Sequence, residues 1–250
     1  MSDALNTIII IPSRLQAQRF PGKPLASLCG KPMLLHVLEA VRGAGMGDIV
    51  VAAADSEIKD VVEGAGFSCV LTDPGHPSGS DRIFEALQQV DPLGKKEIIL
   101  NIQGDLPVLD TGMLPLLLDA FKNPHVDIAT PVTPFKSHEN PQDPNRVKAA
   151  VAWRADENHG RALYFSRSPI PFGAEVYYHH IGIYAYRRQA LERFISLPVG
   201  FLEQEEKLEQ LRALENGMWI EAVKVKESPL SVDTPEDLKY VENYLRQKKI

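Results

Sequence analysis

A cationic loop follows the first strongly apolar segment of the chain. The sequence IIIIPSRLQAQRFPGKPL, residues 8–25, places Arg14, Arg19 and Lys23 after a run of isoleucines, and residues 4–38 contain no acidic side chain. The loop has neither the GxGxxG pattern of dinucleotide-binding folds nor the GxxxxGK[ST] pattern of P-loops, so side chains must supply the positive charge. Several cations close together favour a triphosphate or pyrophosphate ligand. A solvated surface loop is the alternative.

Two aspartates have the setting expected of magnesium ligands. Asp105 ends the apolar segment EIILNIQGD (97–105), and Asp233 lies in SVDTPEDL (231–238), before a predicted helix. Proteins bind Mg²⁺ through one or two carboxylates together with substrate phosphates and water. The two aspartates therefore predict a Mg²⁺ site. For each of them a turn or helix-capping role is the alternative.

A predicted helix begins with small and cationic residues. The motif HPSGSDR (76–82) places Ser78, Gly79 and Arg82 at this helix start. The N–H groups of a helix N-terminus point outward and favour an anion. The motif therefore predicts a site for phosphate or for the edge of a base.

The second half of the chain holds further polar candidates. Arg167 ends the segment YFSR, and His180 and Tyr184 lie in HHIGIY (179–184). The two histidines of that motif lack a partner at metal-ligand spacing, so zinc is not expected, and His180 is expected to bond a polar substrate or a neighbour. Glu209 and Gln210 belong to the mostly charged segment EQEEKLEQLR (203–212). Such a segment is usually a helix face exposed to solvent, but these two side chains can point inward.

The first half of the chain alternates between strands and helices. Strands are predicted at 7–12, 48–55, 68–72 and 97–105, and helices at 31–45, 56–66 with Ser56 as N-cap, 78–90 and 111–121. Continuous apolar strands separated by helices are typical of a parallel sheet covered on both faces. Ligands of such sheets bind beyond the carboxyl ends of the strands, where the cationic loop and Asp105 are expected.

The second half is predicted to contain more strands and fewer helices. Strands are predicted at 127–135, 146–153, 161–167, 179–187 and 218–227, and helices at 201–217 and 234–249, the last with Thr234 as N-cap and Pro235 at its first position. No low-complexity linker or internal repeat divides the chain.

The composition limits the classes of function. The chain has 250 residues and a net charge of −6, which argues against nucleic acid as a partner. Two cysteines give neither a disulfide framework nor a metal knuckle. No signal peptide or membrane span is predicted. A local cationic loop on an acidic protein therefore favours a small anionic ligand.

The motifs in this order resemble the 3-deoxy-manno-octulosonate (KDO) cytidylyltransferases, or CMP-KDO synthetases, within the sugar nucleotidyltransferases. The matching stretches cover nearly the whole chain: IIPSRLQAQRFPGKPL, GKPMLLHVLE, HPSGSDR, NIQGDLP, PNRVKAA, ALYFSRSPIP, HHIGIYAYR, LEQLRALENG and VDTPEDL. The opening loop resembles the wider superfamily, whereas LEQLR and HIGIY are similar to the KDO branch.

The resemblance implies an α/β, Rossmann-like nucleotidyltransferase fold with a mainly parallel central sheet flanked by helices. A smaller, strand-rich part for sugar binding and dimerisation is also implied. Within a single domain spanning 1–250, residues 1–125 would mainly bind nucleotide and 126–230 would bind sugar and form a homodimer. Residues 231–250 would close the metal site with a loop and a helix.

The resemblance also implies a reaction in which KDO attacks the α-phosphate of CTP, giving CMP-KDO and pyrophosphate. The catalytic residues would be Arg14, Arg19, Lys23 and Asp105. The three cations would hold the triphosphate and stabilise the departing pyrophosphate, and Asp105 and Asp233 would hold Mg²⁺. Further nucleotide contacts would come from Ser78, Gly79, Arg82 and Gln103, whose amide can read the cytosine edge.

The sugar-facing positions implied by the resemblance are Arg167, His180, Tyr184, Glu209 and Gln210. Arg167 would bind the KDO carboxylate, and the others would bond its hydroxyl groups. KDO is a component of lipopolysaccharide, and CTP is found in the cytoplasm, so the resemblance implies a cytoplasmic enzyme of lipopolysaccharide synthesis.

One position departs from the family pattern. Leu106 follows Asp105 where an acidic residue is usual, which leaves the metal environment and the acceptor sugar open. The alternatives are a cytidylyltransferase for 8-amino-KDO, sialate or methylerythritol phosphate, and a non-catalytic nucleotide-binding regulator.

Overall fold

Four apolar strands form the centre of the first of two compact units. The computed structural model describes residues 6–16, 19–155 and 158–248. Its first unit comprises Met1–Gly112 and Pro229–Ile250, and its second comprises Met113–Ser228. These limits differ from the predicted functional boundaries after residues 125 and 230, and the predicted division of labour remains a prediction.

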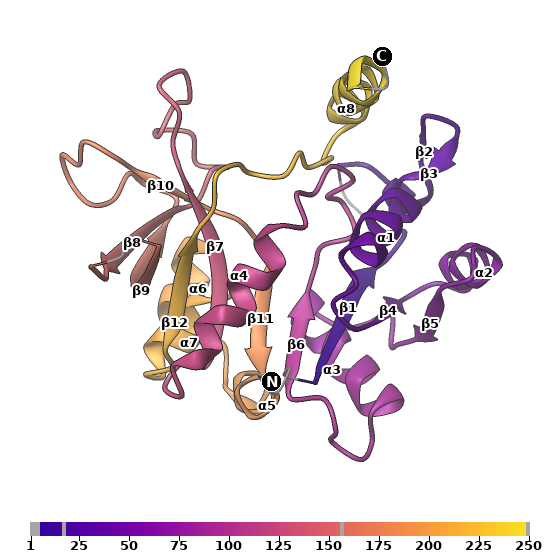
Figure 1. The fold of residues 1–250 in the computed structure, drawn as a ribbon, viewed down its shortest axis with the longest axis horizontal. Helices are drawn as coiled ribbons and strands as arrows, with labels where there is room; N and C mark the ends of the chain where they lie inside the picture. Colours follow the sequence, from indigo (N-terminus) through magenta and orange to yellow (C-terminus); the bar gives the residue numbers. More distant parts are fainter. Residues whose placement is uncertain (1–5, 17–18, 156–157, 249–250) are drawn as a thin grey trace. The chain divides into compact units, whose positions relative to one another are not determined.

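These four central strands are all parallel. In spatial order they are β6 (Ile98–Asn101), β1 (Thr7–Ser13), β4 (Asp48–Ala53) and β5 (Ser68–Leu71). Figure 1 shows β1 between β4 and β6. β1 is an inner strand, and helices cover both faces of the sheet, so its isoleucines are buried and its continuous apolar sequence is explained. The carboxyl ends of β1 and β6 consequently lie side by side.

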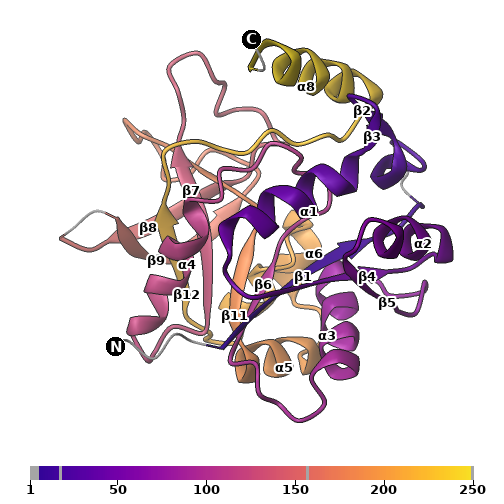
Figure 2. The ribbon, with the colours of Figure 1, turned by 45° about the vertical axis from the view of Figure 1, so that its right-hand side comes forward.

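Helices connect these strands by crossovers. They are α1 (Met33–Ala44), α2 (Ser56–Gly64) and α3 (Gly79–Val90). The chain moves outward from β1 to β5 and then returns to β6, so right-handed crossovers place α1 and α2 on one face of the sheet and α3 on the other. Figure 2 shows α1 and α3 on opposite sides of β1.

Shorter elements complete this unit. They are a 3₁₀ turn η1 (Lys23–Leu25), the short pair β2 (Ser27–Leu28) and β3 (Lys31–Pro32), and the final helix α8 (Pro235–Lys248). The predicted N-cap of α8 is confirmed, since Thr234 Oγ1 accepts a hydrogen bond from the N–H of Asp237 at 3.2 Å. The predicted cap Ser56 is wrong, because Asp55 holds the N-cap position and Ser56 is already helical.

The described residues of the second unit form six strands. They are β7 (Ile128–Pro134), β8 (Lys148–Trp153), β9 (His159–Ser166), β10 (Tyr178–His180), β11 (Tyr184–Arg187) and β12 (Ile220–Lys224). Five of them form a closed ring in the order β10, β8, β9, β12, β7 and back to β10. Closure leaves the ring without a free edge, which explains a strand-rich segment with few helices.

The strand directions correct part of the predicted fold class. Among the described strands of the second unit, β7 and β12 are the only parallel pair, and the other pairs are antiparallel. The α/β class is confirmed, but the pairing is mixed rather than mainly parallel. The difference arises because loops without a crossover helix connect β7 to β8, β8 to β9 and β9 to β10, and parallel neighbours need such a crossover.

Five short helical segments accompany the second unit. They are α4 (Met113–Asp119), η2 (Ala120–Lys122), α5 (Arg188–Ser196), α6 (Phe201–Glu206) and α7 (Leu211–Glu215). The sequence analysis did not predict α5. In the part of the chain that the structure describes, no helix is sufficiently long and apolar to cross a membrane.

Two predicted elements of this unit are broken. The predicted strand 179–187 is divided by a tight turn in which the N–H of Ile183 donates to the carbonyl of Ile181 at 2.7 Å. The predicted helix 201–217 ends early, because Lys207 adopts a left-handed conformation with φ of 56°. Local amphipathic pattern does not reveal such stops.

Candidate active site

A cavity of about 990 Å³ opens beyond the carboxyl ends of β1 and β6 in the first unit. This volume is large enough for a nucleotide. The structure brings around it every residue predicted to bind nucleotide or metal: Arg14, Arg19, Lys23, Ser78, Gly79, Arg82, Gln103, Asp105 and Asp233. Their individual roles remain predictions.

The two predicted metal ligands converge on one ammonium group. Lys23 Nζ lies 2.7 Å from Asp105 Oδ2 and 3.3 Å from Asp233 Oδ1. Arg19 Nη2 lies 3.1 Å from the same oxygen of Asp233. The lysine side chain is 14% exposed and that of Asp233 is 41% exposed, so these ion pairs lie at the wall of the cavity and are reachable from it.

This donor set fits Mg²⁺. The two carboxylates converge on the position of the Lys23 ammonium group, so they already favour a positive charge there. Both offer the hard oxygen atoms that Mg²⁺ prefers. Among the described residues no group of three or more His, Cys, Asp or Glu side chains could hold a metal. The remaining ligands of a bound ion would therefore come from substrate phosphates and water.

The main chain fixes the position of Lys23. Gly22 precedes it in a left-handed conformation, φ 72°, which favours glycine, and the N–H of Gly22 donates to the carbonyl of Leu15 at 2.9 Å. The N–H of Leu15 in turn donates to Asp55 Oδ2 at 2.8 Å, just beyond β4. The cationic loop is thus closed on itself and anchored to the sheet.

The C-terminal segment brings Asp233 to the cavity. The N–H of Val232 donates to the carbonyl of Asp105 at 3.0 Å, and Leu230 forms a bridge with Val108. Asp237 accepts hydrogen bonds from the N–H groups of Asp233 and Thr234 at 3.0 and 2.9 Å. Burial alone would raise the pKa of Asp237, but these bonds outweigh it and lower the pKa, so the carboxylate anchors the turn that carries Asp233.

Leu106, the departure from the family pattern, is buried and does not line the cavity. Asp105 keeps its place at the cavity wall without an acidic neighbour, because the contacts of Asp105 come from Lys23 and from the main chain of Val232.

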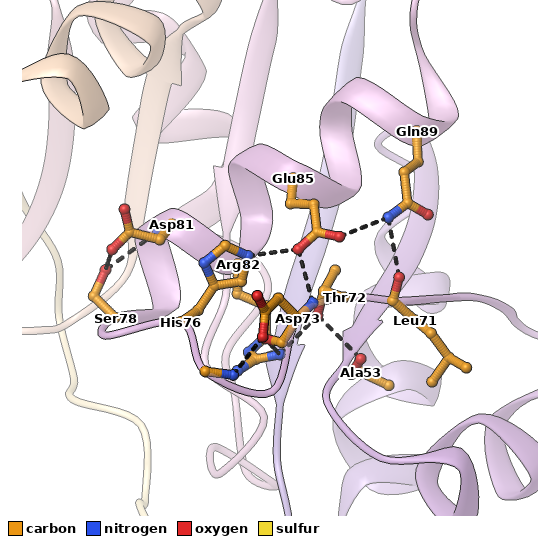
Figure 3. Close-up of polar contacts among 11 residues, drawn as sticks. Ala53, Leu71, Thr72, Asp73, His76, Ser78, Asp81, Arg82, Glu85 and Gln89 are labelled. Carbon is orange, nitrogen blue, oxygen red and sulfur yellow. Dashed lines mark hydrogen bonds and ion pairs between the residues drawn. The ribbon is translucent and has the colours of Figure 1, made fainter.

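The start of α3 also lines the cavity, and Figure 3 shows the polar contacts around it. Ser78 is its N-cap and accepts from the N–H of Asp81 at 3.2 Å. Arg82 is only 2% exposed, and its Nη1 donates to Thr72 Oγ1 at 2.7 Å and to the carbonyl of Asp73 at 3.1 Å. Burial, and then the charge of Arg14, lower the pKa of Arg82. Two neighbouring cations therefore make this wall attractive to an anion.

Two residues that the sequence analysis missed hold the segment leading to Ser78. Figure 3 shows Glu85 accepting from the N–H of Asp73 at 2.8 Å and bonding His76 Nε2 at 2.5 Å. Gln89 donates to Glu85 at 3.0 Å. Burial would raise the pKa of Glu85, but the hydrogen bonds lower it. The sequence signal that could have identified Glu85 is its carboxylate one helical turn after Arg82.

Ser13 was also missed. It ends β1, lines the cavity and is buried, and its hydroxyl has no hydrogen-bond partner among the described residues. A serine at the end of a buried strand carries no sequence signal of its own.

The second unit contains the predicted sugar-facing residues. The guanidinium group of Arg167 donates to three main-chain carbonyls, those of Glu206 at 2.8 Å, Pro144 at 2.9 Å and Lys207 at 3.3 Å. The N–H of Arg167 donates to Glu206 Oε2 at 2.9 Å. Arg167 is therefore held in place by the protein.

His180, Tyr184 and Glu209 are neighbours. The rings of His180 and Tyr184 lie 5.5 Å apart, and His180 Nε2 is 3.0 Å from Thr130 Oγ1. Burial, and then His179, lower the pKa of His180 to about 3, so its ring is neutral at pH 7. Burial, and then the charges of Tyr186 and Glu209, raise the pKa of Tyr184.

Gln210 adjoins this group in sequence at the start of α7. Its side chain is buried, and its Nε2 has no partner among the described residues. A buried amide that lacks a partner is suited to a ligand with hydroxyl groups.

A parallel α/β unit with cations and paired carboxylates beyond its strand ends defines a nucleotide-binding protein of the transferase type. The family described as Cytidylyltransferase matches residues 8–225. A 3-deoxy-manno-octulosonate cytidylyltransferase of Paramagnetospirillum magneticum is 53% identical, covering 94% of this chain and 95% of the relative. One of Methylorubrum extorquens is 47% identical over the full length of both chains.

A solved structure agrees with these relatives. A CMP:2-keto-3-deoxy-manno-octonic acid synthetase complexed with CTP superposes with a TM-score of 0.89 at 36% identity, covering 97% of this chain and 99% of that one. A 4-diphosphocytidyl-2C-methyl-D-erythritol synthase, at 17% identity and a TM-score of 0.64, shares the fold. The chain belongs to the 3-deoxy-manno-octulosonate cytidylyltransferase family.

Proposed function

We propose that this protein transfers CMP from CTP to the anomeric hydroxyl of KDO, releasing pyrophosphate. The observation that carries the proposal is the cavity of the first unit, where cationic side chains surround a pair of carboxylates. The relatives named as KDO cytidylyltransferases and the solved relative complexed with CTP support the same substrates.

The bond changes balance without a redox partner. The anomeric oxygen of KDO forms a bond to the α-phosphorus of CTP, and the bond from that phosphorus to the bridging oxygen breaks. Pyrophosphate leaves with the electron pair, and the hydroxyl proton is lost to solvent or to a phosphate oxygen. Such a transfer needs positioning and charge neutralisation more than covalent help from the protein.

The cationic residues supply that neutralisation. Arg14, Arg19 and Lys23 would bind the triphosphate and stabilise the charge that develops on the leaving pyrophosphate. Asp105 and Asp233 would hold Mg²⁺. A bound Mg²⁺ supplies Lewis-acid chemistry, which polarises the α-phosphate and lowers the pKa of the attacking hydroxyl.

Lys23 would change partners when CTP binds. Its ammonium group now neutralises both carboxylates, and Arg19 shares Asp233 with it. A triphosphate offers the two cations stronger partners, and their departure frees the carboxylate oxygens for metal. Lys23 therefore links nucleotide binding to the formation of the metal site.

The remaining residues of the first unit would recognise the nucleoside. Ser78, Gly79 and Arg82 line the cavity at the start of α3, and Gln103 lines it after β6. The Gln103 amide has both donor and acceptor groups for the cytosine edge.

The second unit would bind the sugar acid. Arg167 would pair with the carboxylate, and His180, Tyr184, Glu209 and Gln210 would bond the hydroxyl groups. The neutral imidazole of His180 and the protonated phenol of Tyr184 suit uncharged hydroxyl partners.

A homodimer in the cytoplasm completes the proposal. Leu163, Phe172 and Val176 of the second unit are exposed apolar side chains, which supports a self-association surface there. CTP and the synthesis of lipopolysaccharide precursors are expected in the cytoplasm.

The test is pyrophosphate release from CTP with and without KDO, with Mg²⁺ present or chelated, and with UTP as the alternative nucleotide. The proposal predicts release that requires KDO, CTP and Mg²⁺ together. Release with 8-amino-KDO or sialate in place of KDO would reassign the acceptor. Absence of release with every acceptor would favour a nucleotide-binding regulator.

A further inference from the structure

Lys148 is a charged side chain at the centre of the second unit. It begins β8 and is 0% exposed, which is rare for lysine. Buried charges persist only where the fold satisfies them. The contacts of Lys148 therefore indicate what the charge is for.

Three main-chain carbonyls surround its ammonium group. Nζ donates to the carbonyls of Asp143 at 2.9 Å and Arg146 at 2.7 Å, and it also donates to the carbonyl of Arg167. An ammonium group has three N–H donors, so these acceptors use all of them. None of the acceptors is a carboxylate, and Lys148 thus ties together two main-chain segments rather than forming an ion pair.

Both segments hold Arg167. One contains Arg167 itself, whose carbonyl accepts from Lys148. The other contains Pro144, whose carbonyl accepts from Arg167 Nη1 at 2.9 Å and which lies between the two remaining acceptors of Lys148. Lys148 therefore fixes the main chain of Arg167 and also the carbonyl against which the Arg167 guanidinium rests.

The charge of Lys148 adds to that of Arg167. Burial lowers the pKa of Lys148, the charge of Asp143 raises it, and the charge of Arg167 lowers it, so the two cations are close enough to repel. The carboxylate charge of Glu206 offsets part of this positive charge. Glu206 is held nearby because it accepts from Ser166 Oγ at 2.6 Å and from the N–H of Arg167 at 2.9 Å. Two adjoining cations in one rigid frame favour a carboxylate at the Arg167 guanidinium.

We propose that Lys148 is a positioning residue for the sugar acid, which holds the guanidinium of Arg167 ready for the KDO carboxylate. The inference rests on the proposed function, because it takes KDO as the acceptor and Arg167 as its partner. Arg167 keeps N–H groups beyond its three bonds to carbonyls, since a guanidinium has five.

The test compares wild-type protein with Lys148→Met, Arg167→Ala and the double variant, by pyrophosphate release at varied KDO and CTP. Lys148→Met is expected to raise the KM for KDO about tenfold, as expected for a weakened charge-assisted interaction, with the KM for CTP within about twofold. Lys226→Met removes an exposed lysine of the same unit and is the matched control, with both KM values unchanged.

The double variant separates positioning from a general loss of structure. If Lys148 acts through Arg167, Lys148→Met changes the KM for KDO by less than about twofold when Arg167 is already alanine. The same increase in both backgrounds, or a loss of kcat with both KM values unchanged, would overturn the proposal. If Lys148→Met is insoluble, Lys148→Gln replaces it in the same design with the same criteria.

The wild-type protein distinguishes the two proposals. If it releases no pyrophosphate in response to KDO, the proposed function fails and the role of Lys148 fails with it. If wild-type release depends on KDO but the variants do not show the expected pattern, only the role of Lys148 is overturned.

Discussion

The ion-paired residues at the cavity of the first unit differ from the buried charges of the second unit. In the first unit Lys23, Arg19 and Asp233 form ion pairs at a cavity wall, with side chains that are 14, 65 and 41% exposed. In the second unit Lys148 and Glu221 are fully buried and are held by carbonyls or by close partners. One set of charges can exchange partners, and the other cannot.

This difference matches the ligands that we propose. A triphosphate arrives with several charges and leaves as pyrophosphate, so the residues around it must form and release ion pairs in each cycle. A sugar acid is recognised by shape and by fixed hydrogen bonds, which favours groups whose positions are set before binding.

The largest effect on turnover is expected at Asp105, one of the two carboxylates paired with Lys23 at the cavity. Asp105→Ala should lower kcat about a hundredfold or more, because the variant loses a metal ligand that acts on the transferred phosphate. Pyrophosphate release measures the change. Asp110→Ala, in which the exposed carboxylate bonds only locally to the N–H of Gly112, is the control and should keep normal turnover. Near-normal turnover of Asp105→Ala would show that the metal assignment is wrong.

The fixed histidine of the second unit predicts a loss of stability in acid. His180 has a folded pKa of about 3, below the usual 6.5, so the unfolded chain binds a proton first as the pH falls. The contribution of neutral His180 to the free energy of unfolding is fully present above pH 6.5 and is lost as the pH falls from 6.5 to 3. At pH 4.5 the loss is roughly 3 kcal/mol.

Urea unfolding at pH 7 and 4.5 measures this loss. His180→Phe cannot titrate, so its free energy of unfolding should change less between the two pH values than that of the wild type. An equal acid-induced loss in both proteins would mean that His180 does not remain neutral in the fold.

The ion pairs of Lys23 predict an effect opposite to its effect on catalysis. Lys23→Met should tighten the binding of Mn²⁺ to the nucleotide-free protein by about tenfold, because the competing ammonium is gone, while kcat falls. Electron paramagnetic resonance of free Mn²⁺ measures this binding. Lys31→Met removes a lysine paired with Glu39 and is the control. Unchanged or weaker Mn²⁺ binding in Lys23→Met would contradict the exchange of partners.

A pair of glycines provides the smallest test. Gly22 and Gly173 have φ values of 72° and 67°, and both have open space around the missing side chain. Alanine at either position should cost about 1 kcal/mol in stability. Only Gly22→Ala is expected to raise the KM for CTP, since Gly22 shapes the loop before Lys23. Thermal unfolding measures the loss of stability, and steady-state rates measure the KM for CTP. If Gly22→Ala and Gly173→Ala had the same KM for CTP, the conformation of the loop would not affect nucleotide binding.

The sequence predicted best where chemistry follows a regular element. The isoleucine strand and the loop after it placed Arg14 and Lys23 correctly at the cavity, because parallel strands end at one edge. The approach of Asp233 to Asp105 was predicted from the chemistry of a Mg²⁺ site and from the family resemblance. Their separation in sequence says nothing about the bridge between Val108 and Leu230 that brings them together.

Other features could not be predicted from local pattern. The stop at Lys207 is a single left-handed residue within an amphipathic segment, and the turn at 181–183 interrupts an apolar one. Lys148 resembled any lysine at a strand start. Two of its carbonyl partners lie within five residues in the chain, but only the pairing of β8 with β9 brings the third, that of Arg167, to the same ammonium group.

The division between the two units is tested most directly by one pair of variants in one assay. We predict that Arg14→Ala raises the KM for CTP about tenfold and leaves the KM for KDO within about twofold, and that Arg167→Ala does the reverse. If both variants changed the two KM values equally, the charges of the two units would not serve separate substrates, which would contradict the proposed division.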